Sequence, residues 1–122
     1  IPKIGAVGHT TDTGYFEELG KINGNVRVLI ACAMWPRQEQ LRYHLNTDEV
    51  LRIVEEANPG AVILTHFGMK MVNAGPEKEA EYIENSTDVP VIAAKDGLQV
   101  LIGDKIKAIG PRKSDIPRVI DA

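Results

Sequence analysis

Three residues of this chain carry side chains of the types that bind metal ions, and two of them follow segments that are expected to be strands. Asp12 comes shortly after the apolar segment 3–8, and His66 directly follows the apolar segment 61–65. His44 lies in the polar connection between those segments. A divalent ion that is held by imidazole and carboxylate groups, with open coordination positions, deprotonates water near neutral pH. The residue types therefore indicate metal-dependent hydrolysis.

Each of these residues also has an ordinary structural interpretation. Asp12 is suited to be the N-cap of a short helix over 15–19. His66 can be a hydrogen-bonded histidine at a strand end, and His44 can be a solvated loop residue. No short motif such as His-Glu-x-x-His ties the three together, so spacing alone does not decide between the two interpretations. His9 is expected to be structural or peripheral.

The composition is that of one globular domain. The chain has 122 residues, of which 43% are hydrophobic and 25% are charged, as is usual for a protein with a single core. Its net charge is −3, without a long block of either sign, which argues against broad electrostatic capture of nucleic acid. Cys32 is the single cysteine and lies in the apolar segment 28–34, so we expect a core thiol and no internal disulfide.

The same sequence argues against a membrane protein. No apolar stretch reaches the roughly 18–20 residues that a bilayer-spanning helix needs, and no segment resembles a signal peptide. We therefore expect no membrane association and a reducing, cytoplasmic location. The chain begins with Ile1 rather than methionine, from which we expect trimming or excision from a longer protein.

The hydrophobic periodicity predicts alternating strands and helices in the first two thirds of the chain. Strands are expected over 3–8, 26–34 and 61–65, where β-branched and other apolar residues run continuously. A helix over 46–57 is expected because Asn46 is followed three positions later by Glu49, which is the pattern of a capping box. A stripe of aliphatic residues on this helix should pack on the sheet.

The last third is expected to change to antiparallel pairing. A helix over 77–85 follows Gly75-Pro76. A strand over 89–94 should then form a hairpin with 98–102 through the turn signal Asp96-Gly97, before a further strand over 105–109. Residues 116–122 can be a last strand or a loosely attached tail. The pattern predicts an α/β fold with residues 1–122 as one domain.

Three segments taken together resemble the second half of the metallo-β-lactamase-fold hydrolases. These are 11–16, 44–49 and 63–68, and their order and separations match across most of the chain. The segment around Asp12 is similar to the bridging aspartate motif of that family, and the segment around His66 is similar to its final metal-binding histidine. The resemblance implies the C-terminal half of an αββα sandwich, with a mixed β-sheet and helices on one face.

The segment that begins at His44 resembles a histidine-containing segment of the ribonuclease Z and phosphodiesterase-like branch, where that histidine assists phosphoryl chemistry. The next residue is Leu45, whereas ribonuclease Z typically carries serine there. By this resemblance Asp12 bridges two zinc ions, His66 completes the second, and a metal-bound hydroxide attacks a phosphodiester or related ester. His44 then stabilises or protonates the leaving oxygen. The substrate is a small-molecule or nucleic-acid ester.

The family's first-half cluster, His-x-His-x-Asp-His, does not occur in these 122 residues. The resemblance therefore implies a half-domain that needs the N-terminal half of the same fold, or self-association, to complete the site. We expect the sheet face opposite the helices to be an exposed apolar patch that mediates this contact. The alternative is a non-catalytic α/β interaction module that keeps the scaffold without a complete metal site. A nucleotide-binding domain is disfavoured because Gly5-Ala6-Val7-Gly8 lacks the Gly-x-Gly-x-x-Gly spacing.

Overall fold

Two aliphatic strands form the centre of the fold in a computed structural model, which describes residues 5–39 and 43–121. The parallel sheet that contains them has strands β1 (Val7–His9), β2 (Val28–Trp35), β3 (Leu45–Asn46), β4 (Ala61–Thr65) and β5 (Val91–Ala93). Its order is β1-β2-β4-β5, and β3 pairs with the C-terminal end of β2. The expected strand over 3–8 is β1, although residues 3 and 4 lie outside the described residues. All pairings are parallel, so the C-terminal ends of the strands meet at one edge.

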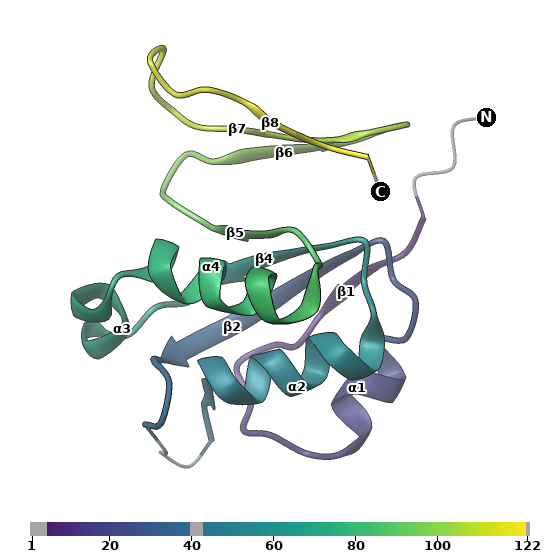
Figure 1. Ribbon diagram of the computed structural model, residues 1–122, viewed down its shortest axis with the longest axis vertical. Helices are drawn as coiled ribbons and strands as arrows, with labels where there is room; N and C mark the ends of the chain where they lie inside the picture. Colours follow the sequence, from purple (N-terminus) through teal and green to yellow (C-terminus); the bar gives the residue numbers. More distant parts are fainter. Residues whose placement is uncertain (1–4, 40–42, 122) are drawn as a thin grey trace.

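Helices cover one face of this sheet (Figure 1). They are α1 (Glu18–Ile22), α2 (Thr47–Ala57), α3 (Met69–Ala74) and α4 (Pro76–Thr87). The predicted capping box is present, since Asn46 Oδ1 accepts the backbone N–H of Glu49 at 2.7 Å and Glu49 Oε1 accepts that of Asn46 at 3.0 Å. Val50, Ile53 and Val54 of α2 are buried against the sheet. No helix in the described part of the chain is long and apolar enough to cross a membrane.

The first helix differs from the expectation. It begins at Glu18 rather than at residue 15 and continues through Gly20. Its N-cap is Glu17, which makes no side-chain capping bond, so the interpretation of Asp12 as the N-cap of this helix is wrong. Glycine at position 20 allows α1 to pack closely on α2, because a Cβ atom there would lie 2.7 Å from Cβ of Glu56.

A second, antiparallel sheet covers the other face of the parallel sheet (Figure 1). Its strands are β6 (Gln99–Ile102), β7 (Ile106–Ile109) and β8 (Arg118–Ile120), in that order. Val28 and Ile63 of the parallel sheet pack with Ile106 and Ile120 in a continuous apolar layer between the sheets. The expected apolar face is therefore present, but the expectation that it is exposed is wrong. The antiparallel sheet of β6, β7 and β8, which we call the C-terminal meander, folds back over it.

The hairpin that was predicted around Asp96-Gly97 does not form. Leu98 N–H donates to the carbonyl oxygen of Lys95 at 3.0 Å, so a tight turn is present with Gly97 at φ 85°. However, β5 pairs with β4 and β6 pairs with β7, so the turn carries the chain from one sheet to the other. Such a turn signal specifies a local reversal of the chain but not which strands pair. Residues 118–120 form the last strand, which excludes the loose-tail alternative for them.

Candidate metal centre

Asp12 lies in the loop that leaves the C-terminal end of β1, and the buried Thr10 fixes this loop to β2. The N–H of Thr10 donates to the carbonyl oxygen of Ile30, and Thr10 Oγ1 accepts the N–H of Cys32, each at 3.0 Å. His9 Nδ1 accepts the N–H of Thr11 at 2.8 Å. These bonds hold the backbone on the N-terminal side of Asp12, and they show His9 in the structural role that was expected.

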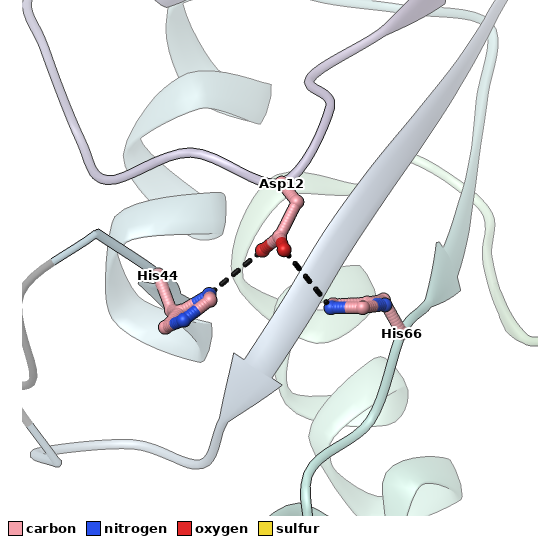
Figure 2. A group of neighbouring side chains, drawn as sticks. All are labelled: Asp12, His44 and His66. Atoms are coloured by element: carbon pink, nitrogen blue, oxygen red, sulfur yellow. Dashed lines mark hydrogen bonds and ion pairs between the residues drawn. The ribbon is translucent and has the colours of Figure 1, made fainter.

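His44 immediately precedes β3. Leu45 of β3 is buried and pairs with Ala33 of β2, and Asn46 caps α2, so the residues that follow His44 are held on two sides. His44 Nδ1 lies 2.7 Å from Asp12 Oδ1 (Figure 2). His44 is a partly exposed loop residue, as one of the two interpretations expects, and its ring has a specific carboxylate partner.

His66 is the first residue after β4. Its Nε2 atom lies 3.4 Å from Asp12 Oδ2, on the side of the carboxylate that is not bonded to His44 (Figure 2). The backbone beyond it is tied to β2, since Gly68 N–H donates to the carbonyl oxygen of Met34 at 3.1 Å. A Cβ atom at Gly68 would lie 3.0 Å from that same oxygen, so glycine permits this close approach.

The structure thus brings together all three residues that the sequence singled out. Their potential ligand atoms lie within 4.8 Å of one another. Two imidazole nitrogens and a carboxylate oxygen form a donor set that zinc accepts, and three protein ligands are the usual number at an open zinc site. The side chains are 29% to 50% exposed, so the cluster lies at the surface of the described chain rather than in its core.

Left-handed backbone accompanies all three site segments. Seven described non-glycine residues have positive φ, and Thr11, Tyr43 and His66 are three of them, at 61°, 71° and 61°. This conformation is unfavourable for residues with a Cβ atom, most of all for a β-branched threonine. Such strained positions gather at functional sites, where the surrounding structure enforces them. No local sequence pattern predicts the left-handed backbone of Thr11 or Tyr43, because threonine and tyrosine seldom adopt that conformation.

An open pocket of about 450 Å³ adjoins His44. Its lining residues are Thr13, Gly14, Tyr15, Phe16, Tyr43, His44 and Glu49. Gly14 allows its two walls to meet, since a Cβ atom there would lie 3.2 Å from the backbone of Tyr43. A different pocket of about 420 Å³, between α4, β5 and the segment that leads into β8, includes none of the three site residues. Of these two pockets, the one beside His44 is therefore the one that adjoins the site.

The Cys32 thiol is buried next to this site, as expected for a core thiol. Burial raises its pKa, the hydrogen bond with Thr10 opposes that shift, and the negative charge of Asp12 adds to it. The thiol therefore stays protonated at neutral pH, and the thiolate that metal binding or nucleophilic attack requires does not form.

Solved structures of known proteins contain the same arrangement of elements. The metallo-β-lactamase fold protein YhfI from Bacillus subtilis matches this chain with a TM-score of 0.63 and 26% sequence identity, over 73% of this chain and 36% of its own. This chain has the metallo-β-lactamase fold over part of that architecture. A diphosphatase from the PhnP family shows the same fold, with a TM-score of 0.56 and 17% identity over 81% of this chain and 37% of its own.

A sequence relative extends the comparison. The uncharacterized protein MJ1374 of Methanocaldococcus jannaschii is 36% identical over 106 residues, which is 84% of this chain and 39% of the relative. No family model matches the chain. The chain thus spans well under half the length of each of these proteins. The α/β class and the metallo-β-lactamase fold that the sequence predicted are confirmed for this part.

Proposed function

We propose that this chain is the C-terminal half of a metal-dependent hydrolase of the metallo-β-lactamase fold. In this proposal Asp12 and His66 bind the metal, Asp12 as the bridging ligand, and His44 acts on the substrate. The observation that carries the proposal is the convergence of three donor atoms within 4.8 Å, from loops that follow β1 and β4 and from the residue before β3. Parallel strands place such loops at one edge, where α/β proteins bind their ligands.

The imidazole and carboxylate groups of the cluster fit zinc, and we propose two zinc ions in the complete fold. When bound, zinc would act as a Lewis acid and lower the pKa of water. Asp12 Oδ2 lies toward His66 and Oδ1 toward His44, so in this proposal Asp12 would be both a metal ligand and the hydrogen-bond partner of the His44 ring. The present chain supplies too few ligands for two such ions. The remaining ligands are assigned to the N-terminal half.

His44 is suited to move a proton at the leaving oxygen of the substrate. Its Nδ1 atom is within hydrogen-bonding distance of Asp12, which leaves Nε2 for the substrate. A neutral ring that donates from Nδ1 presents Nε2 as an acceptor, and a protonated ring presents an N–H donor. The Asp12 carboxylate orients the ring in either state. Proton transfer from a positioned histidine is a standard means of stabilising a leaving group.

A phosphodiester or a related ester is the substrate class that we favour. The support is the PhnP-family diphosphatase, whose fold this chain shares, and the resemblance of the His44 segment to the phosphodiesterase-like branch. The pocket beside His44 would receive the leaving group, whether it comes from a small-molecule or a nucleic-acid ester. The aromatic side chains of Tyr15, Phe16 and Tyr43 line this pocket and offer flat apolar surfaces to it.

The N-terminal half of the same fold is the proposed partner. The meander covers the inner apolar face, but its own outer face has exposed aliphatic side chains: Leu101 and Val119 are 54% and 53% exposed. Both are aligned with Lys107 across the three strands, so they form one row on the sheet. In an αββα sandwich that outer face would be covered by the helical layer of the other half. When that half is absent, we expect the same face to mediate self-association.

Zinc titration by calorimetry tests the proposal, with the N-terminal half supplied from the parent coding sequence. We expect His66→Ala and Asp12→Asn to weaken zinc binding, whereas Asp96→Asn, which alters an exposed carboxylate outside the cluster, should leave it unchanged. Zinc affinity that is equal in the wild type and in His66→Ala would remove His66 from the site. A parent sequence without the His-x-His-x-Asp-His cluster would instead favour the non-catalytic interaction module, which the surface exposure of an incomplete donor set also supports.

A further inference from the structure

One buried carboxylate ties down both ends of the connection that carries His44. Glu79 of α4 is only 2% exposed. Its Oε1 atom accepts the backbone N–H of Arg37 at 2.8 Å and the hydroxyl of Thr47 at 3.1 Å. Its Oε2 atom accepts Nε–H of Arg37 at 2.9 Å. Arg37 lies just after β2 and Thr47 is the first residue of α2, so Glu79 joins the start of the connection to its end.

A second carboxylate supports the same connection. Asp48 Oδ2 accepts the backbone N–H of Gln38 at 3.1 Å, and Asp48 Oδ1 accepts the hydroxyl of Tyr82 at 3.0 Å. The Arg37 guanidinium lies over the Tyr82 ring, 4.3 Å from its centroid. The backbone N–H groups of Arg37 and Gln38, which follow β2, therefore donate to two different carboxylates. Arg37 donates to Glu79 of α4, and Gln38 donates to Asp48 of α2. The start of the connection at residues 37 and 38 and the residue that ends it, Thr47, are thus held by hydrogen bonds to carboxylates.

The buried Glu79 carboxylate needs an explanation beyond stability. The side chain of its partner Arg37 is 45% exposed, so Glu79 is the charge that loses its water. Burying a carboxylate is expensive, and apolar residues of similar volume are often as stabilising as a buried charge with its partners. What Glu79 supplies is a fixed geometry, because its two oxygens together accept from three donors at defined positions, two on Arg37 and one on Thr47. Thr47 is three residues after His44, with the β3 residues between them. We call the hydrogen bonds of Glu79 to Arg37 and Thr47 the clamp. Because the clamp fixes Thr47, it also restricts the position of the His44 backbone.

We propose that Glu79 is a positioning residue that holds His44 against Asp12. It does not touch the three site residues in the described structure, and it acts through Thr47 and the backbone of the connection. The role of His44 on a substrate rests on the function proposed above, whereas the geometric effect of Glu79 does not. The two are therefore tested by separate measurements.

The test uses Glu79→Gln and Thr47→Val, each of which removes part of the clamp without emptying the core. Glu84→Gln is the matched control. Glu84 is also on α4, and it also accepts a backbone N–H, from Val91, and an arginine side chain, from Arg118, but these partners lie in β5 and β8 and not in the connection. The readout is the pair of imidazole nitrogen chemical shifts of His44 and the exchange rates of the Arg37 and Gln38 amides, measured by NMR on metal-free protein.

We expect both clamp variants to move the His44 nitrogen shifts toward their values in urea, with His66 unchanged. In Glu79→Gln the Arg37 amide should exchange roughly tenfold faster or more, as expected for the loss of a hydrogen bond to a charged group. The Gln38 amide donates to Asp48, so its exchange rate shows whether the loosening extends along the connection. Glu84→Gln should change neither. If both clamp variants leave the His44 shifts at their wild-type values, or if Glu84→Gln shifts them equally, then Glu79 is merely structural and the proposal is wrong.

The assembled protein separates this result from the proposed function. There, Glu79→Gln should lower kcat on the order of a hundredfold through misplacement of His44. Zinc affinity should stay unchanged, since Asp12 and His66 lie on other segments. A wild-type protein without zinc binding would overturn the proposed function while the metal-free NMR result still stands. A fall in zinc affinity that matches that of His66→Ala would contradict an effect of Glu79 through His44 alone.

Discussion

His66 Nε2 lies 3.4 Å from Asp12 Oδ2, and His66 reaches this position with its backbone in the left-handed region at φ 61°. The two facts belong together. A strand that continued in the extended conformation would alternate its side chains between the two faces of the sheet. The left-handed turn directly after β4 instead directs the His66 ring along the sheet edge toward Asp12. The strained backbone is therefore part of the way the site is built.

Replacement of His66 by glycine and by alanine should separate strain from metal binding. Glycine adopts the left-handed conformation without a Cβ penalty, while it adds entropy to the unfolded state. We therefore expect His66→Gly to be more stable than His66→Ala by roughly 0.5–1 kcal/mol in urea unfolding. Both variants should lose zinc affinity in the assembled protein. Equal stability of the two variants would mean that position 66 is not strained.

Asn46 should contribute more to stability than an exposed polar residue of the same type. Asn46→Ala removes the capping bond to Glu49 and also the bond from Asn46 Nδ2 to the carbonyl oxygen of Glu39. The free energy of unfolding should fall by about 1–2 kcal/mol. Asn85 is exposed on α4 and provides the control, since alanine is a better helix former there. Similar losses at both positions would argue against the capping box.

Glu84 should stabilise the fold in a pH-dependent way. Burial works against its charged form, but the bonds from Val91 N–H and Arg118 prevail and lower its pKa below the ordinary 4.5. A group with a lowered pKa in the folded state contributes stability that is complete above its unfolded pKa and is lost as the pH falls through the folded value. The stability advantage of the wild type over Glu84→Gln should therefore be present at pH 7 and should shrink below about pH 4.5. An advantage that grows on acidification would reverse the assigned direction.

Cys32 should react slowly with thiol reagents in the folded protein. Its thiol is buried, and burial raises its pKa even though the Thr10 hydrogen bond acts in the other direction. Labelling at pH 8 should become fast only in denaturant, where the thiol is exposed and its pKa returns to the ordinary range. Thr10→Ala should raise the thiol pKa further, because it removes the opposing hydrogen bond. Fast labelling of the native protein would contradict a closed core at this position.

The outer face of the meander should control association of the isolated chain. We expect light scattering to detect oligomers, and we expect Leu101→Lys with Val119→Lys to yield monomers by placing charge on that face. Ile22→Lys is the matched control, because Ile22 is 69% exposed but lies on α1, away from the meander. A wild-type chain that is monomeric at all concentrations would remove this face as an interaction surface.

Features that depend on neighbours along the chain could be predicted from the sequence. The capping box of Asn46 and Glu49 and the strand β4 follow from local hydrogen bonding and from continuous apolar residues. The convergence of Asp12 and His66 was also accessible, because parallel strands direct their C-terminal loops to a common edge. These inferences needed no knowledge of which distant residues meet.

The strand pairing and the contacts that hold His44 in place depend on residues that are distant in the sequence, so the sequence did not predict them. The turn at Asp96-Gly97 is local, but whether β6 returns to β5 or crosses to another sheet depends on the apolar layer that both sheets share. The clamp at Glu79 likewise unites residues of α4, α2 and the connection after β2. A buried glutamate has no periodic or motif signal in the sequence. Its partners are chosen by packing, because desolvation makes its charge tolerable only where several donors converge.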